Sequence, residues 1–158
     1  MPRITIYDTT LRDGSQTQGI SFSVNDKIKI TKKLDALGVH YIEGGWPGSN
    51  PKDKNYFEDI RKMKLSHAKV AAFGSTRRAK VKASQDFNLR ELIKSKATTT
   101  TIFGKSCDLH VTDVLKTTLE QNLEMVFDSI AFLKSKRKEV FYDAEHFLMV
   151  INAIPNMP

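Results

Sequence analysis

Residues 4–16 read Ile-Thr-Ile-Tyr-Asp-Thr-Thr-Leu-Arg-Asp-Gly-Ser-Gln, and the interpretation of the whole chain starts from this stretch. Residues 4–7 are rich in β-branched side chains and predict a strand, which five polar residues follow. In parallel α/β proteins, ligands bind beyond the carboxyl ends of the strands, because the loops there converge on one face. Arg12 is therefore a candidate clamp for a carboxylate, and Asp13 is a candidate ligand of a divalent metal.

The composition is typical of one globular domain, with 158 residues of which 40% are hydrophobic and 27% are charged. No run approaches the ~18 apolar residues of a membrane span, and the N-terminus lacks the apolar core of a signal peptide. We therefore expect a cytoplasmic protein without membrane contact. Cys107 is the only cysteine, which excludes a disulfide within the chain and a zinc site built on cysteines.

The net charge of +7 raises the question of nucleic-acid binding. The lysines are dispersed, and the densest group, at 134–138, lies at the end of a predicted helix, where cations complement the helix dipole. The Thr-Arg-Arg sequence at 76–78 has no interleaved aromatic residues of the kind that stack on bases. We therefore expect a solvated basic surface and no nucleic-acid partner.

Hydrophobic periodicity predicts strands that alternate with helices. Further strands are expected at 39–43, 69–73, 98–103 and from 140 onward, and helices at 24–37, 53–64, 88–96 and 113–136. The last helix is expected to bury an apolar stripe, formed by Val114, Leu115, Leu119, Leu123, Val126, Phe127, Ile130 and Leu133. The alternation implies a parallel sheet, either doubly wound or part of an eight-stranded barrel, and periodicity does not choose between the two.

Residues 8–14, Asp-Thr-Thr-Leu-Arg-Asp-Gly, resemble the signature that opens the barrel of the HMG-CoA lyase and isopropylmalate synthase superfamily. Later motifs, which follow in the same order, resemble its citramalate synthase branch and lie at 19–23, 41–52, 103–106, 108–111 and 142–147. The resemblance covers residues 3–147. It implies an α/β fold of the TIM (β/α)₈ family, of pyruvate carboxyltransferase type, with about five β/α units in residues 1–147.

The resemblance also implies a reaction. Members of the branch are acyltransferases that condense acetyl-CoA with pyruvate to citramalate, an entry to isoleucine and hence branched-chain amino-acid biosynthesis, with a divalent metal such as Mg²⁺ or Mn²⁺. The intact enzyme is expected to be a homodimer. Arg12 matches the arginine that binds the oxo acid and stabilises developing negative charge, Asp13 matches the metal-ligating aspartate, and Glu145 matches a catalytic glutamate. Glu43 would line the same pocket, either in a supporting role or in direct contact with the substrate.

Other polar residues have competing interpretations. Arg12 and Asp13 could form only an internal ion pair, and Arg77 could contact a phosphate of CoA or be a solvated loop arginine. His110 and His146 are attractive as metal ligands, but the family takes its histidine ligands from elsewhere, so we expect neither to bind metal. Two positions depart from the family pattern: Cys107 replaces a tryptophan, and Asp143 replaces a tyrosine that contacts pyruvate in some citramalate synthases.

Residues 148–158 depart from the family pattern altogether. The family continues approximately Phe-Asp-Gly-Tyr-Lys-Arg-Asn-Pro-Glu-His-Ala, and deleting one T from codons for that peptide yields the observed Leu-Met-Val-Ile-Asn-Ala-Ile-Pro-Asn-Met-Pro at every position. We therefore interpret 148–158 as an out-of-frame tail, which resequencing across the codon for Leu148 would test. Without the family's His-x-His metal ligands and its later strands, this chain is expected to be inactive.

Two other functions remain open at this stage. Within the superfamily, the chain could derive from a synthase that uses a longer 2-oxo acid, such as isopropylmalate or homocitrate synthase, although the Gly-Gly-Trp-Pro-Gly-Ser-Asn-Pro sequence at 44–51 favours citramalate. Outside it, the chain could be a non-catalytic binding protein or a pseudogene product.

Overall fold

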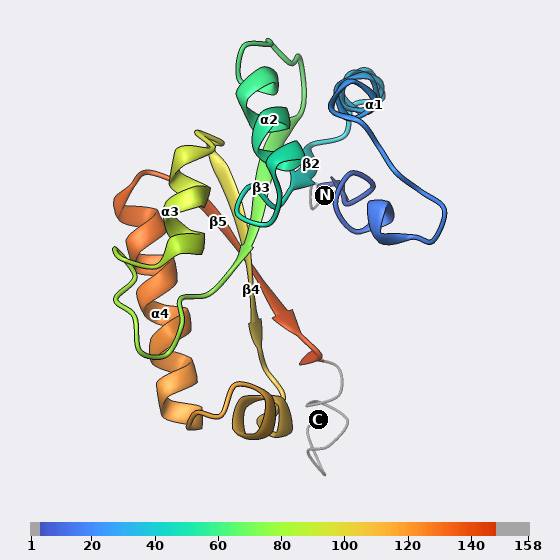
Figure 1. The fold of residues 1–158 in the computed structure, drawn as a ribbon. Coiled ribbons are helices and arrows are strands. Elements are labelled where there is room, and N and C mark those ends of the chain that lie inside the picture. The colour runs from blue at the N-terminus through green and yellow to red at the C-terminus, as the bar shows by residue number, and fades with distance from the viewer. Residues whose placement is uncertain (1–3, 148–158) are drawn as a thin grey trace.

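The computed structural model describes residues 4–147, which form one parallel sheet of five strands with helices packed along it (Figure 1). The strands are β1 (Tyr7–Asp8), β2 (Tyr41–Gly45), β3 (Lys69–Ser75), β4 (Thr99–Lys105) and β5 (Glu139–Glu145). The α-helices are α1 (Val24–Ala36), α2 (Pro51–Ile60), α3 (Phe87–Lys94) and α4 (Leu119–Ser135). A short 3₁₀ turn, Gly14–Gln16, follows β1, and a π-helical turn, His110–Val114, follows β4.

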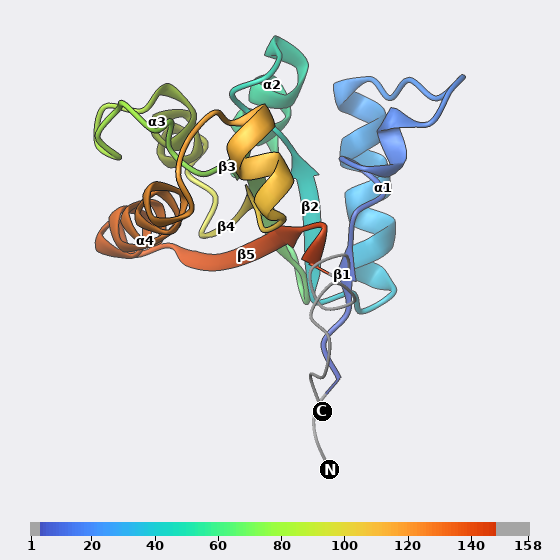
Figure 2. The ribbon, with the colours of Figure 1, turned by 90° about the horizontal axis from the view of Figure 1, so that it is seen from below.

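The strand order is β1-β2-β3-β4-β5, so every strand pairs in parallel with its neighbour in the sequence. A doubly wound sheet reverses its strand order near the middle, whereas a barrel adds strands in one direction. The sheet is curved, and α1 to α4 surround its outer face (Figure 2). The five units therefore form a half-barrel, which confirms the barrel and excludes the doubly wound alternative.

The core lies between the sheet and these helices. Its fully buried side chains include Leu11, Ile42, Tyr56, Phe57, Leu89, Leu92, Ile102 and Leu133. Helix α2 packs tightly against Gly44 of β2, where a Cβ atom would lie 2.4 Å from Cε1 of Tyr56 and 2.9 Å from a methyl carbon of Val70. Only a residue without a side chain lets α2 pack this closely.

Replacing Gly44 with alanine should therefore lower the free energy of unfolding by about 1–3 kcal/mol, because the added methyl group overpacks a rigid contact. Gly14→Ala is the matched control, since a Cβ at Gly14 would meet its nearest atom, Cγ2 of Thr10, at an ordinary 3.8 Å. Urea denaturation of both variants measures the difference. Equal stabilities would contradict the packing argument.

Each α-helix begins at a side-chain cap. Ser23 and Asp26 form a reciprocal capping box at α1, and Asn50 caps α2 with Pro51 in the first turn. Asp86 caps α3 and Thr118 caps α4 by accepting hydrogen bonds from backbone N–H groups. These caps fix where each loop at the carboxyl end of a strand stops.

The opening strand is shorter than predicted. β1 contains only Tyr7 and Asp8, while Ile4 and Ile6, which suggested a strand, are exposed.

The predicted helix at 113–136 is wrong at its start and in its buried face. Lys116 has a positive φ of 53°, which ends the π-helical turn, and α4 begins only after Thr118. The predicted stripe is largely exposed, at Val114, Leu115, Leu119, Leu123 and Phe127. The residues that α4 buries are Asn122, Met125, Ser129 and Leu133. Two of these four are polar, and the side-chain hydrogen bonds that permit their burial leave no hydrophobic signal.

Within residues 4–147, no helix combines the length and the hydrophobicity that crossing a bilayer requires.

Candidate functional site

The turn after β1 holds Arg12 at the carboxyl end of the sheet. The carbonyl of Thr9 accepts hydrogen bonds from the backbone N–H groups of residues 12, 13 and 14 at 3.1, 2.9 and 3.2 Å. The carboxylate of Asp8 accepts two more, from the backbone and the hydroxyl of Thr10, both at 3.0 Å. This rigid turn aims the Arg12 side chain at the neighbouring strands.

The Arg12 guanidinium has three neighbours in the structure. Its Nε donates to the carboxylate of Glu43 on β2, and its Cζ lies 3.8 Å from the ring centroid of Phe73 on β3. Its Nη1 lies 3.3 Å from Oδ1 of Asp13, whose side chain is 62% exposed. A cation stacked on an aromatic face and paired through one edge is fixed in orientation, which is what a carboxylate clamp requires.

Glu43 is the buried centre of this cluster. It is 1% exposed, and its Oε1 accepts a hydrogen bond from the hydroxyl of Tyr7 at 2.9 Å. The Tyr7 hydroxyl also lies 2.5 Å from Oγ1 of Thr101 on β4. Burial raises the pKa of Glu43, although Arg12 and Tyr7 both favour its charged form. Burial also raises the pKa of Tyr7, which keeps this hydroxyl protonated as a donor.

Aromatic rings border the cluster. Phe73 stacks on Phe103 of β4 with a centroid separation of 5.5 Å, and Trp46 meets both rings edge to face at 5.7 and 5.8 Å. The indole N–H of Trp46 donates to Oδ1 of Asn88 on α3 at 2.6 Å. These contacts give the guanidinium an apolar neighbour on the side of β3 and β4.

A buried ion pair supports the loop after β2. Lys27 of α1 donates to Asp53 of α2 and to the carbonyl of Gly44 at 2.9 Å. Asp53 also accepts the backbone N–H of Trp46 at 2.9 Å. Gly45 has a φ of 141°, and a Cβ there would lie 2.6 Å from the Asp53 carboxylate, so this loop requires glycine.

Glu145 lies apart from this cluster. It ends β5, where it is in register with Lys105 of β4, and Lys105 Nζ donates to its Oε2 at 2.6 Å. Nε2 of His146 lies 3.6 Å from Oε1 of the same carboxylate. Within residues 4–147, no hydrogen bond or ion pair joins Glu145 to Arg12, Asp13 or Glu43. The structure therefore brings together three of the four predicted site residues and holds the fourth in a separate pair.

Three other residues with competing interpretations are Arg77, His110 and His146, and the structure shows the contacts that each of them makes. Arg77 is not a solvated loop arginine: it is buried, its Nε and Nη2 donate to Asp128 at 2.9 and 2.8 Å, and Nη1 donates to three backbone carbonyls. His110 and His146 pack edge to face with centroids 4.5 Å apart. The Nδ1 atom of His110 is buried without a partner among the described residues.

The described residues do not fit a catalytic metal ion. Between residues 4 and 147, no three histidine, cysteine, aspartate or glutamate side chains are grouped so that they could hold one. Asp13 is a single exposed carboxylate beside a cation, and Glu43 is engaged by Arg12 and Tyr7. Mg²⁺ and Mn²⁺ prefer several oxygen ligands, so we derive no catalytic step through a metal from these residues.

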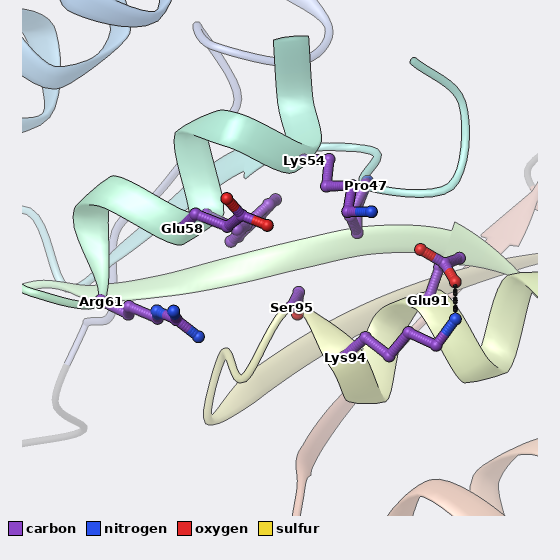
Figure 3. A pocket seen from close by; sticks show the side chains of 8 residues that line it. Pro47, Lys54, Glu58, Arg61, Glu91, Lys94 and Ser95 are labelled. Atoms are coloured by element: carbon purple, nitrogen blue, oxygen red, sulfur yellow. Dashed lines mark hydrogen bonds and ion pairs between the residues drawn. The ribbon is translucent and has the colours of Figure 1, made fainter. Parts of the chain in front are cut away.

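Of the hollows that residues 4–147 form, two are compared with the candidate site. One, between α2 and α3, has a volume of about 40 Å³ and is bordered by the Glu91 to Lys94 ion pair (Figure 3). It contains none of the candidate site residues. The other has a volume of about 270 Å³ and lies at the carboxyl ends of β3 and β4, with Arg78, Phe103, Lys105, Leu115 and Met125 among its lining residues. The second hollow is the larger of these two, and its lining combines cationic with apolar side chains.

A sequence model of the family described as HMGL-like matches residues 3–153. The chain belongs to the HMGL-like family. Its similarity to the (R)-citramalate synthase of Geobacter sulfurreducens is 58% identity over 156 residues, which are 99% of this chain and 30% of that protein. The (R)-citramalate synthase of Aquifex aeolicus is 57% identical over 145 residues, 92% of this chain and 28% of that protein. The resemblance seen in the sequence motifs is thus confirmed, and the chain spans about a third of these relatives.

Solved structures of hydroxymethylglutaryl-CoA lyases share the fold. The hydroxymethylglutaryl-CoA lyase of Pseudomonas aeruginosa superposes with a TM-score of 0.67 at 17% sequence identity, covering 89% of this chain and 45% of that one. The lower coverage of the lyase agrees with a half-barrel matched to part of a longer chain of the same fold.

Sequence reasoning missed Tyr7, Phe73 and Lys105, the side chains that fix the predicted site residues. Period-two alternation could have found Tyr7, because it pairs in register with Tyr41 and therefore shares a sheet face with Glu43, two residues further along β2. The contact of Arg12 with Phe73 could not be found in this way, because Arg12 lies in a turn, where side chains do not alternate, and Phe73 lies on β3.

Proposed function

We propose that the chain is the N-terminal part of a citramalate synthase, in which Arg12 binds the carboxylate of pyruvate. The observation that supports this most is the fixed Arg12 guanidinium, stacked on Phe73 and paired with Glu43. The identity to two (R)-citramalate synthases over nearly the whole chain supports the choice of substrate. The reaction is a Claisen-type condensation, in which the acetyl methyl group of acetyl-CoA loses a proton and attacks the ketone, and thioester hydrolysis releases CoA.

Arg12 and Glu43 have complementary roles in this proposal. Glu43 occupies the Nε edge of the guanidinium, and Nη1 donates to the exposed carboxylate of Asp13 at 3.3 Å, so a ligand carboxylate that displaces Asp13 would meet the edge formed by the two Nη groups. A planar carboxylate can accept two parallel hydrogen bonds from such an edge. Glu43 would act by orienting Arg12, and Tyr7 would act by orienting Glu43.

The hollow at the ends of β3 and β4 is the proposed contact region for acetyl-CoA. Arg78 and Lys105 offer positive charge to phosphate groups, while Leu115 and Met125 offer apolar surface to the thioester arm. Lys105 also donates to Glu145, so an acyl group near this hollow would approach the proposed catalytic carboxylate.

Asp13 stays our proposed metal ligand in the whole protein, whose other ligands would come from outside residues 4–147. Residues 148–158 lie outside the described part of the structure, and their out-of-frame origin stays a proposal that resequencing tests. The isoleucine pathway, the cytoplasmic location and the homodimeric intact enzyme are proposals of the same kind.

A pyruvate titration of the chain tests the binding proposal. At ten times its dissociation constant, pyruvate should stabilise the fold by about 1.4 kcal/mol and raise Tm by about 3–5 °C. Arg12→Lys should abolish the shift, because an ammonium group can neither stack nor donate two parallel hydrogen bonds. Arg61→Lys, at an exposed arginine after α2, is the control and should keep it. A wild-type Tm that does not change with pyruvate would contradict the proposal.

The same titration separates the alternatives. A larger shift with 2-oxoisovalerate than with pyruvate would favour an isopropylmalate synthase, whose oxo acid carries a branched chain. CoA release from acetyl-CoA, pyruvate and Mg²⁺ should stay at the blank rate, because no three histidine, cysteine, aspartate or glutamate side chains in residues 4–147 are grouped to hold a metal ion. Measurable release would show that this chain is already a synthase.

A further inference from the structure

The loop after β2 holds Trp46, the only tryptophan of the chain, by all three of its hydrogen-bonding groups. Its backbone N–H donates to Asp53 at 2.9 Å, and its carbonyl accepts hydrogen bonds from the backbone N–H and the hydroxyl of Ser49 at 3.0 and 2.9 Å. Its indole N–H donates to Asn88 of α3 at 2.6 Å. The amide of Asn88 in turn donates to the carbonyl and the hydroxyl of Ser75, at the end of β3, both at 2.9 Å. These bonds fix the direction of the indole ring.

The indole contacts the stack of rings on which Arg12 lies. The Arg12 guanidinium is placed over Phe73, and the Phe73 ring is nearly parallel to that of Phe103, with an interplanar angle of 11°. Trp46 is nearly perpendicular to both rings, at 77° to Phe73 and 78° to Phe103. Such contacts are favourable because the positive edge of one ring meets the negative face of another. The indole therefore opposes rotation of both phenyl rings.

The orientation of the Arg12 guanidinium depends on Phe73. Glu43 pairs with Nε, and a second carboxylate, Asp13, is 62% exposed. A firm pair at one edge leaves the guanidinium free to tilt about that edge, whereas stacking on an aromatic ring fixes its plane. Phe73 has no polar side-chain atom, so its ring is held by packing, and Trp46 supplies part of that packing.

We propose that Trp46 is a positioning residue of the carboxylate clamp: it holds Phe73 in the plane on which Arg12 stacks, and Asn88 holds Trp46. The inference rests on the proposed binding of pyruvate by Arg12, and it extends that site to the β2 loop and to α3. Two parallel hydrogen bonds to a carboxylate require the guanidinium and the carboxylate to share a plane, so a tilted guanidinium loses one of them. The ring stack would set this plane, and Glu43 would set the direction within it.

The first test uses the fluorescence lifetime of Trp46, which no other tryptophan obscures. Pyruvate should change this lifetime in a saturable way, with the same dissociation constant as its effect on Tm. Arg12→Lys should remove the change, and Arg61→Lys should keep it. A rise in Tm without a saturable change in lifetime would overturn the inference and leave the proposed function standing. If neither the lifetime nor Tm responded, both would be overturned.

The second test removes the support of the indole. Asn88→Leu deletes the acceptor of the indole N–H and should weaken pyruvate binding about three- to tenfold, the effect of about one hydrogen bond. Asn55→Leu, at an exposed asparagine of α2, is the matched control and should leave the dissociation constant within about twofold.

Two substitutions of Trp46 itself cover the case that Asn88→Leu affects folding. Trp46→Phe keeps an aromatic ring without the N–H group, so it should weaken binding about as much as Asn88→Leu does. Trp46→Leu also removes the ring contact with Phe73 and should weaken binding further. Variants that melt at a lower temperature but bind pyruvate as tightly as wild type would show that Trp46 only stabilises the fold, and would overturn the inference.

Discussion

Glu43→Ala should lower the free energy of unfolding by about 3 kcal/mol, the low end of the range for breaking a buried ion pair. The substitution removes the acceptor of both Arg12 and Tyr7 and leaves a cation in a partly buried position. The loss should lie at the low end because Arg12 keeps some contact with solvent and with Asp13. Urea denaturation followed by circular dichroism measures it.

Asp13→Ala is the control for this loss. It removes the other carboxylate beside Arg12, but that carboxylate is largely exposed, and exposed ion pairs contribute about 0–1 kcal/mol. If the two variants lost equal stability, Glu43 would not be the residue that fixes Arg12.

The free energy of unfolding should also depend on pH through Glu43, and urea denaturation at several pH values measures this dependence. Burial raises the pKa of Glu43 in the folded state, so the native chain binds this proton more readily than the unfolded chain does. The contribution of Glu43 to stability therefore falls as pH rises from the ordinary carboxyl pKa of about 4.3 through the raised folded value. Glu43→Gln removes this fall, so its loss of stability relative to wild type should be smaller above the window than below it.

Lys27→Met should cost about 3–5 kcal/mol of stability, the second large effect that we expect. Lys27 is 1% exposed, and its ammonium group bonds Asp53 and the carbonyl of Gly44. Methionine fills the space but leaves the nearly buried Asp53 carboxylate without its counter-ion. Guanidinium denaturation against the wild type measures the change.

Two further variants distinguish a buried charge from a lost side chain. Adding Asp53→Asn to Lys27→Met removes the unpaired charge but keeps an acceptor for the Trp46 N–H, so the double variant should recover about 1 kcal/mol or more. Lys62→Met breaks an exposed pair with Asp59 and should cost less than about 0.5 kcal/mol. Additive losses in the double variant would contradict the ion-pair explanation.

The elements that sequence predicted well are those with local signals. The start of α1 was predicted at residue 24, where the structure shows a capping box whose two partners, Ser23 and Asp26, lie within one turn. The alternation of strands with helices was enough to predict a parallel sheet. It did not distinguish a barrel from a doubly wound sheet, because both folds have the same local pattern; that choice required the family motifs or the observed strand order.

The buried face of α4 could not be read from hydrophobicity. Asn122 is buried because it donates to the carbonyl of Lys105 at 2.9 Å, and Ser129 because it accepts the backbone N–H of Arg77 at 2.8 Å. Both partners are distant in sequence, so periodicity assigned the burial to neighbouring apolar residues instead.

The candidate site was predictable in its residue types but not in its connections. The motif at 8–14 singled out Arg12 and Asp13, and the end of β2 singled out Glu43. That Arg12 pairs with Glu43, while Glu145 pairs with Lys105, depends on strand register and on the curvature of the sheet. Such contacts join residues more than thirty positions apart and carry no local signature.

The unbroken strand order has a consequence for synthesis. Each of the strands β2 to β5 pairs with the strand that precedes it in the sequence, so every β/α unit that leaves the ribosome finds the neighbour that it pairs with already synthesised. The sheet can grow from β1 to β5 without waiting for a distant partner, which keeps loop closures short and favours fast pairing. The cluster around Arg12 forms in the same order. Each of the strands β1 to β4 adds one of its residues, which are Tyr7, Glu43, Phe73 and Thr101, so the cluster is complete once β4 has paired with β3.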